Sequence, residues 1–305
     1  MNLLKNKKIK IAVHDGPFHP DDVFAVAILS MYFKKPLQIF RTRDPKIWEK
    51  MDYVIDVGRE YDPKRLKFDH HQEGWAEKRK NGILYAAAGL LWREYGEKIT
   101  GSYELAKKID TKIIQTIDAE DNGMDIYKTA IEDVAPYTVA DYVYALNSTW
   151  REKDADSLKS FEEGVDIAQK ILQREIKKSG DSLSGKKKIE EIYKKTKDKR
   201  ILVLDDDYSW KKTVNNYPEP LFVIKQFKDD KKWSVKAVNL KDSKFESKMS
   251  FPQAWAGKTD RELAEVTGVS DAIFCHNRRF MCVAESKEGA VSLANKAIEL
   301  GLKSK

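Results

Sequence analysis

Cysteine is nearly absent from this chain of 305 residues, which contains only Cys275 and Cys282. Because these two residues lie close together in the sequence, they cannot build a disulfide framework or a zinc site of four thiolates. We interpret both as buried hydrophobic side chains in a protein of a reducing compartment.

Long apolar runs are also missing. The chain has no stretch of 18 or more uninterrupted apolar residues, so we expect no membrane span. Its first residues pass from a basic stretch directly into a strand pattern, without the apolar core and small-residue cleavage site of a signal peptide. We therefore expect a cytoplasmic protein that has no membrane partner.

Excess charge is modest. The net charge is +7, from 56 lysines and arginines against 49 aspartates and glutamates. Such a balance favours an encounter with a polyanion such as nucleic acid, but a lysine-rich solvated surface gives the same number. Charge alone does not decide the partner.

The length predicts two domains, because a single hydrophobic core seldom grows beyond about 250 to 300 residues. Residues 1–155 alternate strand and helix patterns, which is typical of an α/β domain in which helices flank a parallel sheet. The strands are expected at 8–14, 37–43, 53–58 and 66–70, and the helices at 21–33, 83–95 and 103–119. We assign the catalytic role to this first domain.

Two further segments follow. Residues 156–200 have a charged helical pattern and are predicted to connect the domains, although 177–188 interrupt the helical periodicity. Residues 201–305 are predicted to form a smaller mixed α+β domain that binds substrate. Its strands are expected at 200–204, 221–225, 233–238, 272–276 and 279–284, before a final helix at 288–300.

Four of the five histidines lie in two short segments, HDGPFHPDD and DHH. The first segment follows a predicted strand and opens a predicted helix, so its side chains project from the carboxyl end of the sheet, where α/β folds place ligands. His14, His19, Asp21 and Asp22 would offer imidazole nitrogens and carboxylate oxygens there. This donor mixture suits Mn²⁺, Fe²⁺ or Zn²⁺.

Other acidic and imidazole side chains follow strand or helix ends. Asp56 comes directly after an apolar run. His70 and His71 can serve one site only if their strand has ended and the chain is turning, because neighbours on a strand face opposite ways. Asp121 ends a long helix, and Asp118 lies near it on the same face, so either is a candidate for the last ligand.

A single histidine or aspartate at a strand end is more often a cap or a hydrogen-bonding group than a ligand. Asp22 can simply cap its helix, and Asp69 can hold His70 or His71 in one tautomer as an outer partner. Four separate segments that deliver such residues to one sheet edge favour a shared site. The pattern predicts two cations about 3.5 to 4 Å apart, with a water activated for attack on phosphorus and with Asp56, His70 and His71 as catalytic residues.

In order and spacing, the motifs HxGxFHxDD, DVG, FDHHQ and DxxDNG resemble those of the melanocyte-proliferating-gene (Myg) family, a branch related to the DHH phosphoesterases. The resemblance extends to LNSTW at 146–150, FPQAWAG at 251–257 and IFCHNRRF at 273–280, and so covers nearly the whole chain. It implies a metal-dependent hydrolase with a DHH-like catalytic lobe, and exonuclease activity on RNA or DNA. Residue by residue, it carries metal ligation onto His19, Asp21, Asp56, His70 and Asp121, with His14 nearby and His71 placed to touch metal or phosphate.

A basic turn is predicted in the second domain, where His276, Arg278 and Arg279 stand between two apolar runs. Their side chains are candidates for gripping substrate, because guanidinium groups contact phosphate in a bidentate way. The alternative is a solvated basic turn without a ligand.

Our leading hypothesis is a 3′-5′ exonuclease on RNA or single-stranded DNA that uses two divalent cations, with Mn²⁺ as the expected ion and Mg²⁺ or Zn²⁺ as alternatives. A phosphoesterase or pyrophosphatase for a small phosphorylated substrate is the second hypothesis. A nucleic-acid-binding protein without turnover is the third. The sequence leaves a homodimer open.

Overall fold

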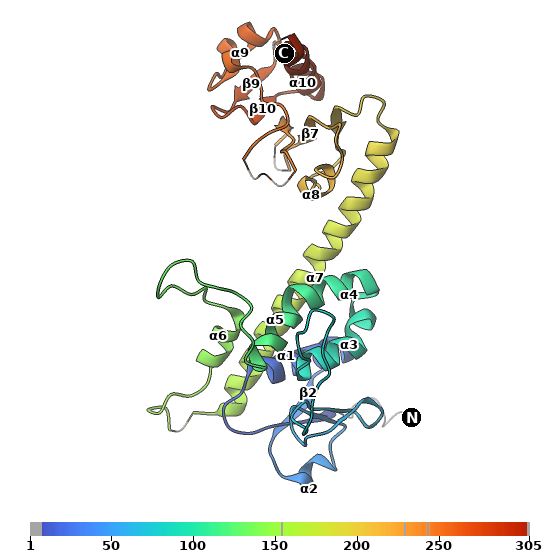
Figure 1. Cartoon of the computed structure of the whole chain (residues 1–305), viewed down its shortest axis with the longest axis vertical. Coiled ribbons are helices and arrows are strands. Elements are labelled where there is room, and N and C mark those ends of the chain that lie inside the picture. Colours follow the sequence, from blue (N-terminus) through green and yellow to red (C-terminus); the bar gives the residue numbers. More distant parts are fainter. Residues whose placement is uncertain (1–7, 154, 229, 242, 244, 304–305) are drawn as a thin grey trace. The chain divides into compact units, whose positions relative to one another are not determined.

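Two units, each with its own five-stranded sheet, make up the chain, and they divide between Gly180 and Asp181 (Figure 1). The computed structural model describes residues 8–153, 155–228, 230–241, 243 and 245–303. Both sheets contain parallel and antiparallel pairs, so the fold is mixed α/β.

The first sheet has the strand order β2-β1-β3-β5-β4. Its strands are β1 (Ile9–Val13), β2 (Leu37–Arg41), β3 (Tyr53–Ile55), β4 (Tyr61–Asp62) and β5 (Lys67–Phe68). β1, β2, β3 and β5 run parallel, so their carboxyl ends share one edge of the sheet. That edge is where the sequence predicted the functional residues.

The expectation of a purely parallel first sheet was wrong at one strand. β4 pairs with β5 in the antiparallel sense. The short 3-10 helix η2 (Pro63–Arg65) joins the two strands, and such a short connection reverses the chain direction, whereas a parallel neighbour would need a long crossover. Two-residue strands of this kind carry too few positions for an alternation pattern to reveal them.

Helices pack against this sheet and against one another. α1 (Pro20–Phe33) is apolar on nearly all sides and is buried from Pro20 to Leu29, because it packs against α3 (Ala87–Thr100) and against two further helices, α5 and α6, described below. The predicted helix at 103–119 consists of α4 (Tyr103–Ile109), the π-helical turn η3 (Asp110–Ile114) and α5 (Gln115–Asp121). The short helices α2 (Pro45–Trp48) and α6 (Val139–Ala145) complete the unit.

α7 (Ser157–Lys195) is a single helix of 39 residues. The interruption expected at 177–188 does not break it. Two glycines in that stretch are accommodated by packing: a side chain at Gly180 would make ordinary contact with Leu105, and Gly185 lies against Tyr208. Glycine lowers helix propensity, but here tertiary contacts outweigh that loss.

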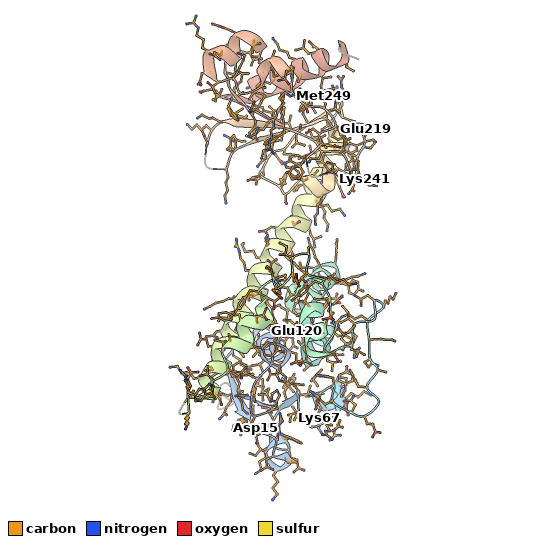
Figure 2. All side chains as sticks on the ribbon, turned by 60° about the vertical axis from the view of Figure 1, so that its left-hand side comes forward. Asp15, Lys67, Glu120, Glu219, Lys241 and Met249 are labelled. Carbon is orange, nitrogen blue, oxygen red and sulfur yellow. The ribbon has the colours of Figure 1, made fainter. Side chains whose placement is uncertain are left out.

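The second unit has the strand order β6-β7-β8-β10-β9. Its strands are β6 (Ile201–Val203), β7 (Phe222–Gln226), β8 (Trp233–Ala237), β9 (Ala272–Cys275) and β10 (Met281–Ala284), and only the β6–β7 pair is parallel. Helices α8 (Lys211–Val214), α9 (Asp260–Thr267) and α10 (Lys287–Lys303) and the 3-10 turn η4 (Gln253–Trp255) accompany the sheet. Met249 packs against this core, with its thioether beside Gly301 of α10 (Figure 2).

Both cysteines are buried in the second unit, on the adjacent strands β9 and β10. Their burial agrees with the interpretation of Cys275 and Cys282 as hydrophobic core residues. Within the part of the chain that the structure describes, no helix combines the length and the apolar character that crossing a bilayer demands.

Candidate metal centre

The loop between β1 and α1 carries the first two histidines. His14 directly follows β1, and His19 is the N-cap of α1. Gly16 has a φ of +84°, a conformation that glycine adopts without strain, and its carbonyl oxygen accepts a hydrogen bond from the guanidinium of Arg41 on β2. The neighbouring strand therefore fixes the shape of this loop.

The same loop is anchored by Phe18 and Asn147. The Phe18 backbone nitrogen donates to Asn147 Oδ1, and the Asn147 side-chain amide donates back to the Phe18 carbonyl oxygen, each at 2.9 Å. The Phe18 ring is buried and meets Phe161 of α7 edge-on, with 5.6 Å between ring centroids. Asn147 belongs to the LNSTW segment, and no local pattern reveals its role, because its partner lies 129 positions away.

The first turn of α1 buries two carboxylates completely, those of Asp21 and Asp22. Asp22 accepts a hydrogen bond from the His19 backbone nitrogen at 3.0 Å, and its other oxygen lies 3.1 Å from His14 Nε2. Asp22 therefore both caps the helix and orients an imidazole. Asp21 accepts from the Ala87 backbone nitrogen through Oδ2, while its Oδ1 has no hydrogen-bond partner.

Asp56 directly follows β3 and stands at the centre of a cluster of acidic and imidazole side chains. We call this set the cluster; its members are His14, His19, Asp21, Asp22, Asp56, Asp69, His70, His71 and Asp121. Its backbone has a φ of 51°, which costs energy for a residue other than glycine and is held by a hydrogen bond from its nitrogen to the Phe68 carbonyl oxygen. One carboxylate oxygen lies 3.4 Å from His14 Nε2 and the other lies 3.3 Å from His71 Nδ1. Asp56 thus combines a left-handed backbone with a carboxylate that lies between His14, which follows β1, and His71, which follows β5.

The DHH segment turns away from the sheet as predicted, because β5 ends at Phe68. The rings of His70 and His71 lie side by side, with centroids 4.1 Å apart. Asp69 accepts a hydrogen bond from the His71 backbone nitrogen at 3.0 Å, and its Oδ1 lies 2.8 Å from His71 Nδ1. Asp69 therefore holds the His71 ring in place, while His70 Nε2 reaches Asp121 at 2.9 Å.

The structure places Asp121, rather than Asp118, in the cluster. Asp121 lies at the end of α5, with one oxygen 3.7 Å from His19 Nδ1 and the other beside His70. Asp118 contacts Arg79 Nη1 at 2.6 Å and accepts from the Gly89 backbone nitrogen at 2.9 Å. Its carboxylate is thus occupied by a buried contact with α3 and the segment before it.

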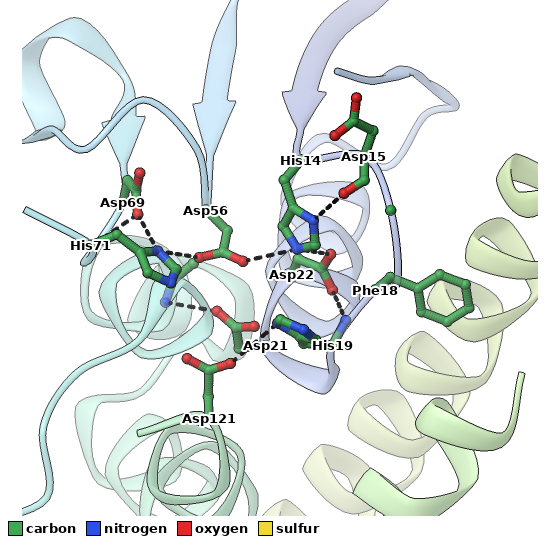
Figure 3. A network of polar contacts seen from close by, with 12 residues as sticks. His14, Asp15, Phe18, His19, Asp21, Asp22, Asp56, Asp69, His71 and Asp121 are labelled. Carbon is green, nitrogen blue, oxygen red and sulfur yellow. Dashed lines mark hydrogen bonds and ion pairs between the residues drawn. The ribbon is translucent and has the colours of Figure 1, made fainter. Parts of the chain in front are cut away.

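The electrostatics of the cluster reflect its crowded carboxylates (Figure 3). Burial raises the pKa of Asp21 well above its ordinary value, and the neighbouring charges of Asp56 and Asp121 raise it further. Burial opposes protonation of His14, yet the adjacent carboxylates raise the pKa of this imidazole to about 10. In the absence of cations, the cluster therefore retains protons to offset negative charge.

Unpartnered polar atoms are concentrated here. Within the described residues, eleven buried side-chain nitrogen and oxygen atoms have no hydrogen-bond partner, and six of them belong to the cluster. These six are His14 Nε2, Asp21 Oδ1, Asp22 Oδ2, both Asp56 oxygens and His70 Nδ1. Because buried polar groups without partners are costly, a concentration at one place indicates that something else satisfies them.

The arrangement fits metal ions. Three overlapping groups each bring one potential ligand atom per residue to within 4.8 Å of the others, and they consist of His14, His19 and Asp56; of His19, Asp21 and Asp121; and of Asp56, Asp69, His70 and His71. The donors are nitrogen and oxygen, without sulfur, as Mn²⁺, Fe²⁺ and Zn²⁺ accept. The buried Asp and His cluster could therefore bind a metal.

A cavity of about 470 Å³ opens beside the cluster. Part of its lining comes from the cluster, namely His14, His19, Asp56, Asp69 and His71. The rest comes from the segments that follow β2 and β3, namely Arg43, Trp48, Val57, Gly58 and Arg59. Sequence analysis missed these lining residues. The available signal was their position, because they follow the same strand ends as the cluster itself.

In the second unit, the candidate substrate contacts His276, Arg278 and Arg279 lie in the turn between β9 and β10, so the predicted hairpin is confirmed. The Arg278 backbone nitrogen donates to His276 Nδ1 at 3.0 Å, and the Arg279 guanidinium donates to the Phe251 carbonyl oxygen at 3.2 Å. Arg279 is therefore engaged in holding its own unit together, whereas Arg278 is exposed.

Comparisons with known proteins place these features in a family context. A family model named MYG1_exonuc, described as an uncharacterised protein family (UPF0160), matches residues 10–298. The MYG1 protein of Schizosaccharomyces pombe is 29% identical over 321 residues, which cover 96% of this chain and 98% of the relative. The MYG1 protein of Dictyostelium discoideum is 28% identical over 95% of this chain and 96% of its own length, and the MYG1 exonuclease of Homo sapiens is 27% identical over 93% and 84%.

Proposed function

This chain belongs to the MYG1 family (UPF0160), and from that premise we propose that it is a metal-dependent exonuclease that hydrolyses phosphodiester bonds at the 3′ end of RNA or single-stranded DNA. Relatives that carry the name exonuclease support the reaction class. We further propose that the first unit is a DHH-like catalytic domain and that residues 201–305 form a substrate domain, with His276, Arg278 and Arg279 as candidate phosphate contacts.

One observation carries the proposal: buried carboxylates and imidazoles from four chain segments converge with their polar atoms unpartnered. A purely structural cluster would pair these atoms with one another at hydrogen-bonding geometry. Instead, the fully buried Asp21 and the almost fully buried Asp56 keep oxygens that make no hydrogen bond, although those of Asp56 lie 3.3 to 3.5 Å from the nitrogens of three histidines. The free-energy cost of burying these oxygens without hydrogen bonds is offset when a bound ligand contacts them.

Each cluster residue has a role in this proposal. The metal ligands are His14, His19, Asp21, Asp56, His70 and Asp121, arranged around two divalent cations. When bound, Mn²⁺ ions would activate a water for attack on phosphorus and neutralise charge on the phosphate oxygens. Asp22 orients His14, and Asp69 orients His71.

His71 is the proposed substrate contact of the DHH segment. Its side chain is half exposed and lines the cavity, unlike the buried His70. Because Asp69 holds its Nδ1, the ring nitrogen left for the substrate is Nε2. That imidazole would orient the phosphate or move a proton at the scissile oxygen.

A substrate panel tests the function. Purified protein with Mn²⁺ should shorten end-labelled RNA or single-stranded DNA into a ladder that starts at the 3′ end, and chelation of the metal should stop the reaction. Oligonucleotides that bind but stay intact with every metal would instead identify a binding protein. Release of phosphate from pyrophosphate alone would identify a small-molecule phosphoesterase.

Metal binding should also be visible as stability. At a free Mn²⁺ concentration 100 times the dissociation constant, the folded state should gain about 2.7 kcal/mol, and thermal unfolding of the first unit should rise by roughly 5 to 10 °C. The measurement is a thermal melt with Mn²⁺ against one with chelator.

Asp121→Asn should reduce this shift, because it removes a ligand of the cluster. Asp125→Asn is the matched control, since Asp125 is an exposed acid only four residues further along the chain. An equal shift in both variants would show that Mn²⁺ binds elsewhere.

A further inference from the structure

The lining of the cavity beside the cluster is of two chemical kinds. Part of it consists of imidazoles and carboxylates of the metal centre, and part consists of an indole ring and two guanidinium groups, from Trp48, Arg43 and Arg59. A phosphate ester has the same division, because its charged phosphate is joined to an uncharged organic group. The cavity has a volume of about 470 Å³, which lies in the range of small-ligand sites, so the cavity suits one nucleotide rather than a run of stacked ones.

Trp48 presents a fixed aromatic surface to this cavity. It is the last residue of α2, and its indole nitrogen donates to the Thr42 carbonyl oxygen at 3.0 Å. Gly58 lies against the six-membered part of the ring: a Cβ added there would stand 3.7 Å from two of its carbons. Because Gly58 has a φ of +96°, glycine is the residue that fits, and the ring can approach the backbone closely.

Arg59 supplies positive charge next to the metal centre. Its backbone nitrogen donates to Asp69 Oδ2, which ties its position to the DHH segment. Its side chain is exposed, and no ion pair engages it within the described residues. Its φ of 54° is strained for a residue with a side chain, so an arginine here is held against its backbone preference.

Arg43 also lines the cavity. Its Nε is 3.2 Å from Asp15 on the surface of the first unit (Figure 2), and 58% of its side chain is exposed. The contact with Asp15 is solvent-screened and weak, so the guanidinium can turn to a phosphate.

We propose that this cavity holds the terminal nucleotide of the substrate, with its base stacked on Trp48 and its phosphate between Arg59 and the metal centre. This inference rests on the proposed function and adds what that function leaves open, namely how the enzyme recognises a strand end. Stacking on an indole is tolerant of base identity, because every base has an aromatic face. The enzyme should therefore require a base at the strand end without selecting which base.

The test compares two RNA oligonucleotides that differ only in whether the 3′-terminal residue carries a base or is abasic. The protein with Mn²⁺ should hydrolyse the base-bearing end with a kcat/KM about 10- to 100-fold higher, as stacking of one base provides. Trp48→Ala should remove this preference, and Trp48→Phe should retain most of it. Trp150→Ala is the matched control, because Trp150 is 80% exposed and does not line the cavity.

Arg59→Gly separates binding from folding. Glycine suits the φ of 54° and keeps the backbone hydrogen bond to Asp69, so the thermal unfolding midpoint should stay the same or rise. The kcat/KM should fall about tenfold on both oligonucleotides alike, because a phosphate contact is lost rather than a base contact. A lower unfolding midpoint would show that Arg59 serves the fold.

Binding gives a readout independent of turnover. Calorimetry should show adenosine monophosphate binding about 10-fold or more tighter than ribose 5-phosphate in the presence of Mn²⁺, and the difference should vanish in Trp48→Ala. If the enzyme cleaves both oligonucleotides equally and Trp48→Ala changes neither, the nucleotide pocket is overturned while the proposed function stands. If no phosphodiester is hydrolysed at all, the proposed function itself fails, and the binding difference still decides the pocket.

Discussion

Asp56→Asn should reduce phosphodiester hydrolysis at least about 10³-fold while the chain stays folded. Asp56 belongs to two of the three ligand groups, and both of its oxygens are buried without a hydrogen-bond partner. Metal ions lower the barrier by several kcal/mol, and each loss of about 1.4 kcal/mol of this stabilisation slows the reaction tenfold. The amide keeps the shape of the side chain, and asparagine tolerates the positive φ, so the loss falls on chemistry rather than on folding.

The chain offers a matched control at the other end of β3. Asp52 precedes β3 as Asp56 follows it, but Asp52 is exposed and accepts a hydrogen bond from the Lys10 backbone nitrogen. Asp52→Asn should therefore keep its activity. Initial rates on end-labelled RNA and metal content by elemental analysis would be measured for both variants. An Asp56→Asn protein that retains its metal and its rate would end the assignment of this cluster as the active site.

Gly89→Ala should destabilise the first unit by about 3 to 5 kcal/mol. The added Cβ would stand 1.8 Å from Asp118 Oδ2 and 2.7 Å from Arg79 Nη2. The buried contact between this arginine and this carboxylate would have to break, which leaves charges without partners in the interior. The thermal transition that responds to Mn²⁺ should move down by roughly 10 °C or more.

Gly180→Ala provides the comparison, because it also replaces a helical glycine but its Cβ would stand an ordinary 3.5 Å from Leu105. That variant should be neutral or gain up to about 1 kcal/mol in helix propensity. Equal melting behaviour in the two variants would mean that Asp118 can move aside, and that its contact with Arg79 matters little to the fold.

The sequence predicted much of the cluster because strand ends are readable. Short apolar runs followed by His14, Asp56 and His70 indicated where parallel strands stop, and the carboxyl ends of such strands meet at one edge. The end of the strand before His70 and His71 followed from the alternation rule for neighbours on a strand, and the structure confirms it. Similarity to the Myg family narrowed the chemistry further.

What the sequence could not predict depends on partners far apart in the chain. The exchange of hydrogen bonds between Phe18 and Asn147 has no local signature. The choice between Asp118 and Asp121 is made by Arg79, whose position no periodicity reveals. The part of the cavity lining that Trp48 and Arg59 contribute arises only when two connections fold beside each other.

The π-helical turn η3 precedes α5 and so affects the direction in which Asp121 points. A π turn contains one residue more than the corresponding α turn, and each residue of a regular helix rotates the chain by about 100°. Because the π turn takes up its extra residue within one turn, loss of one residue there would regularise the helix and leave Asp121 facing His70, whereas loss of one residue between Gln115 and Asp121 would swing Asp121 away. The number of residues from the end of η3 to Asp121 is therefore as strict a requirement as the identity of the acid, and insertions or deletions within α5 should be less tolerated than those within η3.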